Sequence, residues 1–175
     1  GLWAVATSAL SDGIHSLTVT ATDSVDNTSA ASTALAVTID TTNPAAPGTP
    51  DLDAASDTGS ASDDDITSNT ALTVSGTAEA GTSIAVTSDL DGALGTATAD
   101  GAGDWSLTTG TLTAGTNTLT ATATDTAGNT GAASTGLAVT IDVTNPAAPS
   151  APDLTASSDT GTASDDDLTN DTTPT

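Results

Sequence analysis

Residues 118–141 have the sequence TLTATATDTAGNTGAASTGLAVTI, and this stretch decides the fold class. Its first half alternates apolar residues with threonines from Leu119 to Ala123, and its second half alternates again from Leu137 to Ile141. A period of two puts successive side chains on opposite faces of a strand. Each half is therefore predicted to be a β-strand with an apolar core face and a Thr-rich solvent face, which suits a β-branched residue.

The same alternation recurs along the chain, and no segment shows the 3.6-residue period of an amphipathic helix. Gly, Asn and Asp separate the alternating segments at intervals typical of turns. The strands expected in one complete unit lie near residues 71–77, 82–88, 93–99, 104–108, 111–113, 116–124 and 132–142. About seven short strands of this kind predict an all-β fold, an antiparallel β-sandwich of the immunoglobulin type.

Trp105, repeated as Trp3, is the single aromatic residue of this unit. A large apolar side chain in a unit with few others is expected to lie in the core. The alternative is an exposed indole that stacks on sugars.

The chain repeats itself, because residues 1–73 align without a gap with residues 103–175. A period of roughly 100 residues is much longer than a solenoid repeat and indicates a string of whole domains. We predict the C-terminal part of one immunoglobulin-like repeat at 1–43, a complete repeat at 44–145 and the N-terminal part of the next at 146–175. Such a chain is expected to be a segment of a longer protein.

The segment TNPAAPGTPD, residues 42–51, carries three prolines and returns at residues 144–153. Each proline fixes its own φ and biases the preceding residue toward extended conformations. We expect a short, stiff connector between sandwiches rather than a flexible tether.

The charge balance restricts the partners. The chain has 23 acidic residues, no Lys or Arg and a net charge of −23. Nucleic acid is excluded as a partner because phosphate binding needs basic side chains, and no apolar run is long enough to insert into a membrane. Cys is absent, so no disulfide staples the fold. High charge also occurs in disordered chains, but the regular alternation favours folded strands.

Counting strands predicts where the acidic segments meet. If residues 71–77 are the first strand and run away from the entry end, the loop 57–65, the turn 89–92 and the turn 125–129 all lie at that end. Asp40 of the preceding unit reaches the same end just before the connector. Carboxylates about 5 Å apart repel by about 3 kcal/mol at an effective dielectric near 20. The cluster therefore needs a cation, or else it consists of solvated acidic turns, which is the alternative.

Calcium is the expected ion. Ca²⁺ takes six to eight oxygen ligands in flexible geometry, whereas Zn²⁺ prefers Cys and His, and this chain has no Cys and one His. The primary candidate ligands are Asp40, Asp57, Asp63, Asp64, Asp65, Asp125 and Asn129. Their repeat copies and neighbouring acidic positions complete the set: Asp23, Asn27, Asp89, Asp91, Asp142, Asp159, Asp165, Asp166 and Asp167. The spacing differs from that of an EF-hand, since no Glu closes a twelve-residue loop.

Several motifs occur in a fixed order: SDTGSASDDD (56–65), SGTAEAGTSI (75–84), LGTATADGAGDWS (94–106), TLTATATDTAGNT (118–130) and LAVTIDVTNPAAP (137–149). In these motifs the chain resembles the bacterial immunoglobulin-like repeats of giant secreted (RTX-type) adhesins and biofilm-associated proteins. It departs from them at residues 70–73, TALT, where the family usually has TTPT. The resemblance implies rod-like extender arrays, type I secretion to the cell surface and Ca²⁺ binding.

Catalysis is not expected, because His15 is the only His and its copy is Asn117. A glycosidase pair of carboxylates would need a cleft lined with aromatic residues, and each unit has one Trp. The prediction is a non-catalytic structural extender whose joints between neighbouring repeats of the same chain are stiffened by Ca²⁺. The alternatives are a subunit that assembles with other copies into an extracellular filament, sheath or surface layer, and a module that binds glycan or ice through its Thr ladders.

Overall fold

The computed structural model describes residues 2–160, 162–163 and 167–173. Its contacts group the chain into two compact units, Gly1–Val143 and Thr144–Thr175. The described residues contain no α-helix, and nothing among them forms a helix long and apolar enough to cross a lipid bilayer. The all-β prediction is confirmed.

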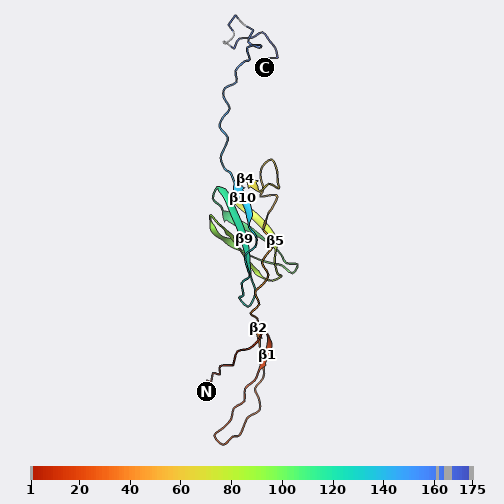
Figure 1. Cartoon of the computed structure of the whole chain (residues 1–175), viewed down its shortest axis with the longest axis vertical. Coiled ribbons are helices and arrows are strands. Elements are labelled where there is room, and N and C mark those ends of the chain that lie inside the picture. Colours follow the sequence, from red (N-terminus) through yellow and green to blue (C-terminus); the bar gives the residue numbers. More distant parts are fainter. Residues whose placement is uncertain (1, 161, 164–166, 174–175) are drawn as a thin grey trace. The chain divides into compact units, whose positions relative to one another are not determined.

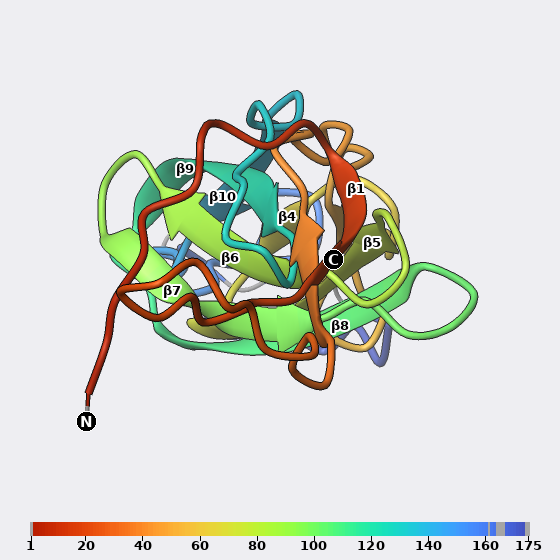
Figure 2. The same cartoon turned by 90° about the horizontal axis from the view of Figure 1, so that it is seen from below.

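The strands of the described residues all lie in the first unit. They are β1 (Gly13–Leu17), β2 (Leu35–Ile39), β3 (Asp51–Leu52), β4 (Ile66–Thr67), β5 (Ala71–Thr77), β6 (Ser83–Ser88), β7 (Gly92–Thr98), β8 (Asp104–Thr111), β9 (Gly115–Thr124) and β10 (Leu137–Ile141). Strands β3 to β10 form two sheets, ordered β4-β10-β9-β6-β7 and β3-β5-β8, and β1 pairs only with β2. Figure 2 shows β6, β7, β9 and β10 in one layer and β5 and β8 in the other.

The core lies between the two sheets and follows the period-two pattern. In β9, Leu119, Ala121 and Ala123 are fully buried, and the threonines between them lie on the outer face. Leu72 and Val74 of β5 are equally buried and face them from the other sheet. Alternation in the sequence is therefore a sufficient guide to the strands that cross the core.

Three details differ from the predicted strands. No separate strand forms at 111–113, because β8 extends to Thr111 and the next residue, buried Leu112, donates its backbone N–H to Thr70 O (2.8 Å). The two-residue strands β3 and β4 were not expected, since two residues show no period. The sandwich is also not wholly antiparallel, because β4 pairs in parallel with β10.

Trp105 is 3 % exposed, so the prediction of a core tryptophan is confirmed and sugar stacking by this indole is wrong. It sits on β8 opposite Gly76 of β5, and a Cβ at Gly76 would lie 2.7 Å from its Cζ2 atom. The indole therefore lies flat against a glycine backbone, which explains why position 76 has no side chain.

We expect Gly76→Ala to lower the free energy of unfolding by about 1–3 kcal/mol, since the new methyl group forces a fully packed indole to move. Gly110→Ala on β8 is the matched control, because a Cβ there meets no atom within 4 Å. Urea unfolding of both variants measures the difference. Equal stability of the two variants would show that Trp105 has room to shift.

Candidate metal site

The acidic loop, residues 56–67, begins with a tight turn. The backbone N–H groups of Ser56 and Asp57 both donate to Asp53 O, at 2.7 and 3.1 Å. Thr67 then holds the base of the loop, because its hydroxyl donates to Ser56 O (2.7 Å) and accepts the backbone N–H of Thr58 (3.2 Å). These bonds place the Asp57 side chain inside the loop, where it is 5 % exposed.

Only one of the two carboxylate oxygens of Asp57 has a hydrogen-bond partner. Its Oδ2 accepts the backbone N–H of Asp65 (3.2 Å), but its Oδ1 is buried and has no hydrogen-bond partner. An unsatisfied buried acceptor costs roughly 1–3 kcal/mol, and more when it is charged. Native structures avoid this cost unless water or an ion completes the group.

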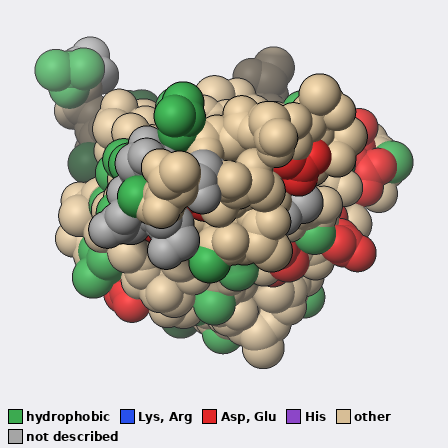
Figure 3. All heavy atoms as spheres, turned by 90° about the horizontal axis from the view of Figure 1, so that it is seen from above, with side chains coloured by type: hydrophobic (Ala, Val, Ile, Leu, Met, Phe, Trp, Pro, Cys, Tyr) green, Lys and Arg blue, Asp and Glu red, His purple; other side chains and the backbone are tan. Residues whose placement is uncertain are grey.

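Asp65, in the same loop, is influenced by the charges of several carboxylates. Asp65 adopts a left-handed backbone with φ 57°, and burial raises the pKa of its carboxyl, with further contributions from the charges of Asp57, Asp51 and Asp64. A raised pKa means that ionised Asp65 costs the fold stability as the pH rises through that pKa. A bound cation would reverse the cost. Figure 3 shows acidic side chains and no Lys or Arg on the face seen from above, so the protein supplies no cation of its own.

The described residues of the second unit, Thr144–Thr175, repeat the turn with which this loop begins. Ser158 and Asp159 donate their backbone N–H groups to Thr155 O, at 2.7 and 3.0 Å. Asp159 is 6 % exposed, and its Oδ1 again has no partner. Asp167 repeats the φ of 57° and its Oδ1 accepts the backbone N–H of Leu154 (3.4 Å). The turn and the buried, unpartnered Oδ1 of the aspartate thus recur in both copies of the sequence. The predicted ligands Asp165 and Asp166 lie outside the described residues.

The acidic loop lies at the exit end of the sandwich, so the predicted convergence of all four acidic segments at the entry end is wrong. Asp65 O accepts the backbone N–H of Thr140 (2.8 Å), and Thr67 O accepts that of Asp142 (2.9 Å). In Figure 1, β4 and β10 lie side by side at the end where the chain leaves the sandwich. Of the predicted ligands, Asp142 therefore lies near this loop, and it does so through its backbone.

The cause of the reversal is the lead-in segment. Gly48 N–H donates to Thr77 O and Asp53 N–H donates to Thr73 O, so residues 48–53 run antiparallel along β5 from its end to its beginning. This segment crosses the whole sandwich before the acidic loop begins. β5 is consequently the second crossing rather than the first, and the turn 89–92 changes ends with the acidic loop. The turn 125–129 does not, because 111–113 forms no separate crossing.

The turn 125–129 lies at the entry end with Asp40. Asp125 Oδ1 accepts the backbone N–H groups of Ala127 and Asn129, and its Oδ2 accepts Asn129 Nδ2 (2.8 Å). Asn129 Nδ2 also donates to Asp40 O (3.1 Å), and Asp40 Oδ1 accepts the backbone N–H of Thr42. The carboxylates of Asp40 and Asp125 thus accept hydrogen bonds within their own turns. A shallow cleft of about 220 Å³ lies beside them and is lined in part by Asp40, Glu79 and Asp125. Asp23 and Asn27 repeat the turn, with Asn27 Nδ2 donating to Asp23 Oδ2 (2.9 Å).

The turn 89–92 is at the same end as the acidic loop but on the opposite edge of the sheet. Asp89 Oδ1 accepts the backbone N–H of Thr118 (2.7 Å). Asp91 accepts both the hydroxyl (2.6 Å) and the backbone N–H (2.9 Å) of Thr113. Both residues therefore join the β6–β7 turn to the start of β9.

Within the described part of the chain, no three His, Cys, Asp or Glu side chains lie close enough together to form a metal site. The residues around Asp57 nevertheless fit Ca²⁺ by chemistry, because the loop offers only oxygen donors and one of them is buried and unsatisfied. Asp63 and Asp64 are exposed in the same loop, where they have room to turn toward an ion.

Sequence reasoning missed two residue types at this site. Thr67 and Ser56, which bury Asp57, are uncharged and were not considered, although both return unchanged as Thr169 and Ser158. The sequence signal that could have found them is that both residues are identical in the two copies of the acidic loop.

The turn at 125–129 gives a pH prediction. The hydrogen bond from the Asn129 side chain, followed by backbone N–H groups, lowers the pKa of Asp125 below its ordinary value of 3.8. A lowered pKa adds stability that is present above the ordinary value and is lost as the pH falls through the folded-state pKa. In Asn129→Ala we expect the pKa of Asp125 to rise toward 3.8, measured by NMR titration of its carboxyl carbon. Asp100, whose pKa is lowered by the backbone N–H groups of Ala102 and Asp104, is the internal control and should not change. An unchanged Asp125 would contradict the assigned bond.

Comparison with known proteins gives one finding on the family. A family model described as a bacterial Ig-like domain matches residues 44–143, which is more than half of the chain and includes every strand from β3 to β10. A comparison with curated proteins found no match.

Proposed function

The chain belongs to the bacterial Ig-like domain family, and from that premise we propose that it is an extender segment of a large secreted bacterial surface adhesin or matrix protein. Domains of this family are typically extracellular and non-catalytic. The extender role follows from the repetition, since one sandwich is copied along the chain with a proline connector between copies. Its function is to hold a distant binding part away from the cell.

We further propose that Ca²⁺ stiffens this segment at the acidic loop. The observation that carries the proposal is the buried, unpartnered Oδ1 of Asp57, which recurs at Asp159. The ion would be held by Asp57, Asp63, Asp64 and Asp65 in the complete repeat and by their copies in the next. Bound there, it supplies positive charge to carboxylates that have no basic partner.

On this proposal, an ion in the loop would act on the connector through Thr67. Asp142, the second residue before the connector 144–153, donates its backbone N–H to Thr67 O (2.9 Å), and Thr67 is the base of the acidic loop. Ordering the loop therefore orders the strand end from which the connector leaves. Each repeat, on this proposal, stiffens the joint that follows it.

Calcium is expected to bind with an affinity typical of extracellular modules, near 10⁻⁴ M. At about 10 mM free Ca²⁺, 100 times that value, binding stabilises the fold by about 2.7 kcal/mol. Calorimetric titration of the whole chain checks this, with Mg²⁺ as the control ion because its strict octahedral geometry suits this loop poorly. Absence of a Ca²⁺ signal, or equal binding of both ions, would count against the proposal. X-ray scattering with and without chelator then tests stiffness, and we expect a smaller radius of gyration when Ca²⁺ is removed.

A further inference from the structure

The proline connector packs against the sandwich that follows it. Pro44, Pro47 and Pro50 are buried, whereas the residues between them are exposed. A spacing of three matches the three residues per turn of a polyproline II helix, so the prolines lie on one face of the segment, and that face is the buried one. Because proline fixes φ, the segment loses little conformational freedom when it docks. We call residues 44–50 the strap.

The strap contacts both sheets of this sandwich. The backbone N–H of Gly48 donates to Thr77 O (2.9 Å), at the end of β5. The hydroxyl of Thr49 is hydrogen-bonded to that of Thr135, in the loop that joins β9 to β10. Since β5 lies in one sheet and β9 and β10 lie in the other, the strap joins the two sheets at the entry end.

The closest approach of the strap to the sandwich is at Gly131. A Cβ at this position would collide with the carbonyl oxygen of Pro44, so no side chain fits between the two backbones. Gly131 has no positive φ, so the close contact, rather than the backbone conformation, requires a glycine. The preceding repeat has Ser29 at the corresponding position, so a strap seated there must lie farther away.

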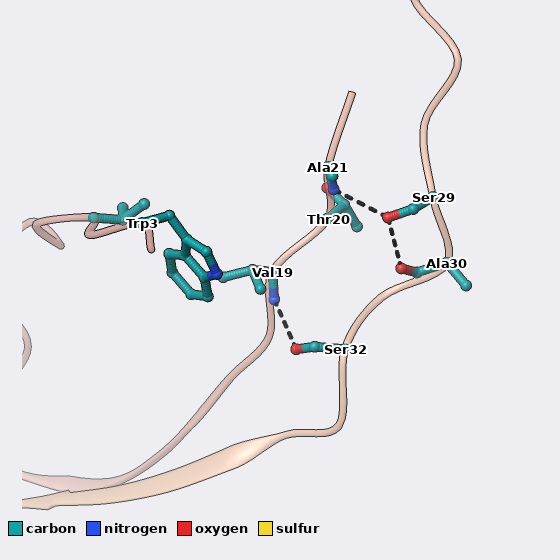
Figure 4. A pocket seen from close by; sticks show the side chains of 8 residues that line it. Trp3, Val19, Thr20, Ala21, Ser29, Ala30 and Ser32 are labelled. Carbon is teal, nitrogen blue, oxygen red and sulfur yellow. Dashed lines mark hydrogen bonds between the residues drawn. The ribbon is translucent and has the colours of Figure 1, made fainter. Parts of the chain in front are cut away.

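The loop on which the strap lies is held by its own hydrogen bonds. Ser134 Oγ accepts the backbone N–H of Ala121 (3.0 Å), and Ser134 N–H donates to Ala121 O (2.8 Å). The same pair of bonds joins Ser32 to Val19 in the copy of this loop, at 3.2 and 2.9 Å, and Figure 4 shows the first of them. These bonds do not involve the strap, so the loop is shaped by its own sequence and offers a preformed surface.

The upstream end of the connector is held by the preceding repeat. Asp12 accepts the hydroxyls of Thr41 (2.8 Å) and Thr42 (3.3 Å). Asn43 is the residue between this attachment and Pro44, and the proline after it biases it toward extended conformations. The joint between the two repeats therefore has little free chain.

We propose that the strap is a brace that needs no metal ion: it fixes the connector to the sandwich that follows and ties the two sheets of that sandwich together. The acidic loop lies at the other end of the sandwich. The proposed calcium ion would therefore act on the joint that follows a repeat, whereas the strap acts on the joint that precedes it. Neither inference depends on the other.

The strap also lies in line with a pull on the chain, a role that rests on the proposed extender function. The chain enters the sandwich at one end and leaves it at the other, so tension runs along the strands. Residues 48–53 lie antiparallel to β5 and are hydrogen-bonded to it at both ends. A pull on the strap loads these bonds together, in shear, rather than one after another. The strap therefore resists tension before the core does.

Amide hydrogen exchange of the whole chain tests the strap, with Gly48 N–H as the reporter, first in chelator and then in Ca²⁺. Gly48 should exchange slowly and at the same rate in both. Gly131→Ala should speed exchange at Gly48 by about tenfold or more, since overpacking a close contact opens the strap locally. The amides that pair β6 with β9 should keep their rates. Gly101→Ala is the matched control, because a Cβ there meets no atom within 4 Å.

A second pair of variants covers the case in which Gly131→Ala destabilises the whole sandwich. Pro47→Ser removes a buried ring and should speed exchange at Gly48, whereas Ala46→Ser changes an exposed neighbour and should not. The proposal is overturned if Gly48 is unprotected in the unchanged chain, if its protection needs Ca²⁺, or if the two variants of either pair affect it equally. A chain that binds no Ca²⁺ but keeps a protected Gly48 would support the strap and count against the calcium site alone.

Discussion

Trp105→Ala is expected to lower the free energy of unfolding by about 3 to 5 kcal/mol, the largest effect of any single substitution in this chain. The indole is the largest side chain in a core built otherwise of Leu, Ile, Val and Ala. Its removal leaves a cavity between Gly76 and the facing sheet, and glycine has no side chain that can fill it. A domain of about 100 residues is stable by roughly 5 to 15 kcal/mol, so much of that stability is lost.

The chain carries its own control for this experiment. Trp3 is the repeat copy of Trp105 and is 68 % exposed, so Trp3→Ala should change stability by less than about 0.5 kcal/mol. Urea unfolding followed by far-UV circular dichroism measures both variants. Similar losses from the two would mean that the core is not where the structure places it.

Asn117→Ala is expected to cost about 3 kcal/mol, since it breaks a buried polar network. The side chain is fully buried, its Oδ1 accepts Ser88 Oγ (2.8 Å), and its Nδ2 donates to Thr113 O (2.9 Å). Without it, the buried Ser88 hydroxyl and the Thr113 carbonyl lose their partners. They belong to the β6–β7 turn and to the start of β9, so the loss should loosen the exit end of the sandwich.

Two variants control the Asn117 experiment. Asn69→Ala removes an exposed amide and should be almost neutral. Asn117→His should fall between the two, because the copy His15 makes the equivalent bond from Nε2 to Ser11 O (2.7 Å), whereas an imidazole lacks the amide oxygen that accepts the Ser88 hydroxyl. A neutral Asn117→Ala, measured by the same urea unfolding, would contradict the network.

The comparison of His15 with Asn117 also shows what a single sequence can reveal. The exchange of His for Asn between the two copies argued against a catalytic role for this position. The structure shows what His15 and Asn117 have in common. Both side chains donate to the carbonyl four residues earlier, so the position serves the fold. The buried partner on β6 was not predictable, because that contact joins segments 29 residues apart.

The strands were predictable where alternation runs for five residues or more, as in β5, β6, β7 and β9. The strands β3 and β4 were not, because each is two residues long and is set by pairing with a distant strand. That small omission had a large effect on the candidate site. Leaving β3 out of the count put the acidic loop at the wrong end of the sandwich, and counting 111–113 as a separate strand grouped the loop with Asp125 and Asn129.

The residue types predicted an acidic loop that binds a metal ion, but they did not predict which of its carboxylates is buried. Asp57 is buried where the hydrogen bond between Thr67 and Ser56 closes the loop. The run of three aspartates at 63–65 is conspicuous in the sequence because of its charge, but charge does not indicate which side chain is buried. In the described residues of Thr144–Thr175, Asp159 is buried as Asp57 is in the complete repeat.

The most direct test of the account compares thermal unfolding of the whole chain and of Asp57→Asn, each in about 10 mM Ca²⁺ and in chelator. The account predicts that Ca²⁺ raises the unfolding midpoint of the unchanged chain and has a much smaller effect on the variant. In chelator the variant should be as stable as the unchanged chain or more stable, because an amide in place of the carboxylate removes repulsion at Asp65. An unchanged midpoint between Ca²⁺ and chelator in the unchanged chain, or an equal rise in Asp57→Asn, would contradict calcium binding at the acidic loop.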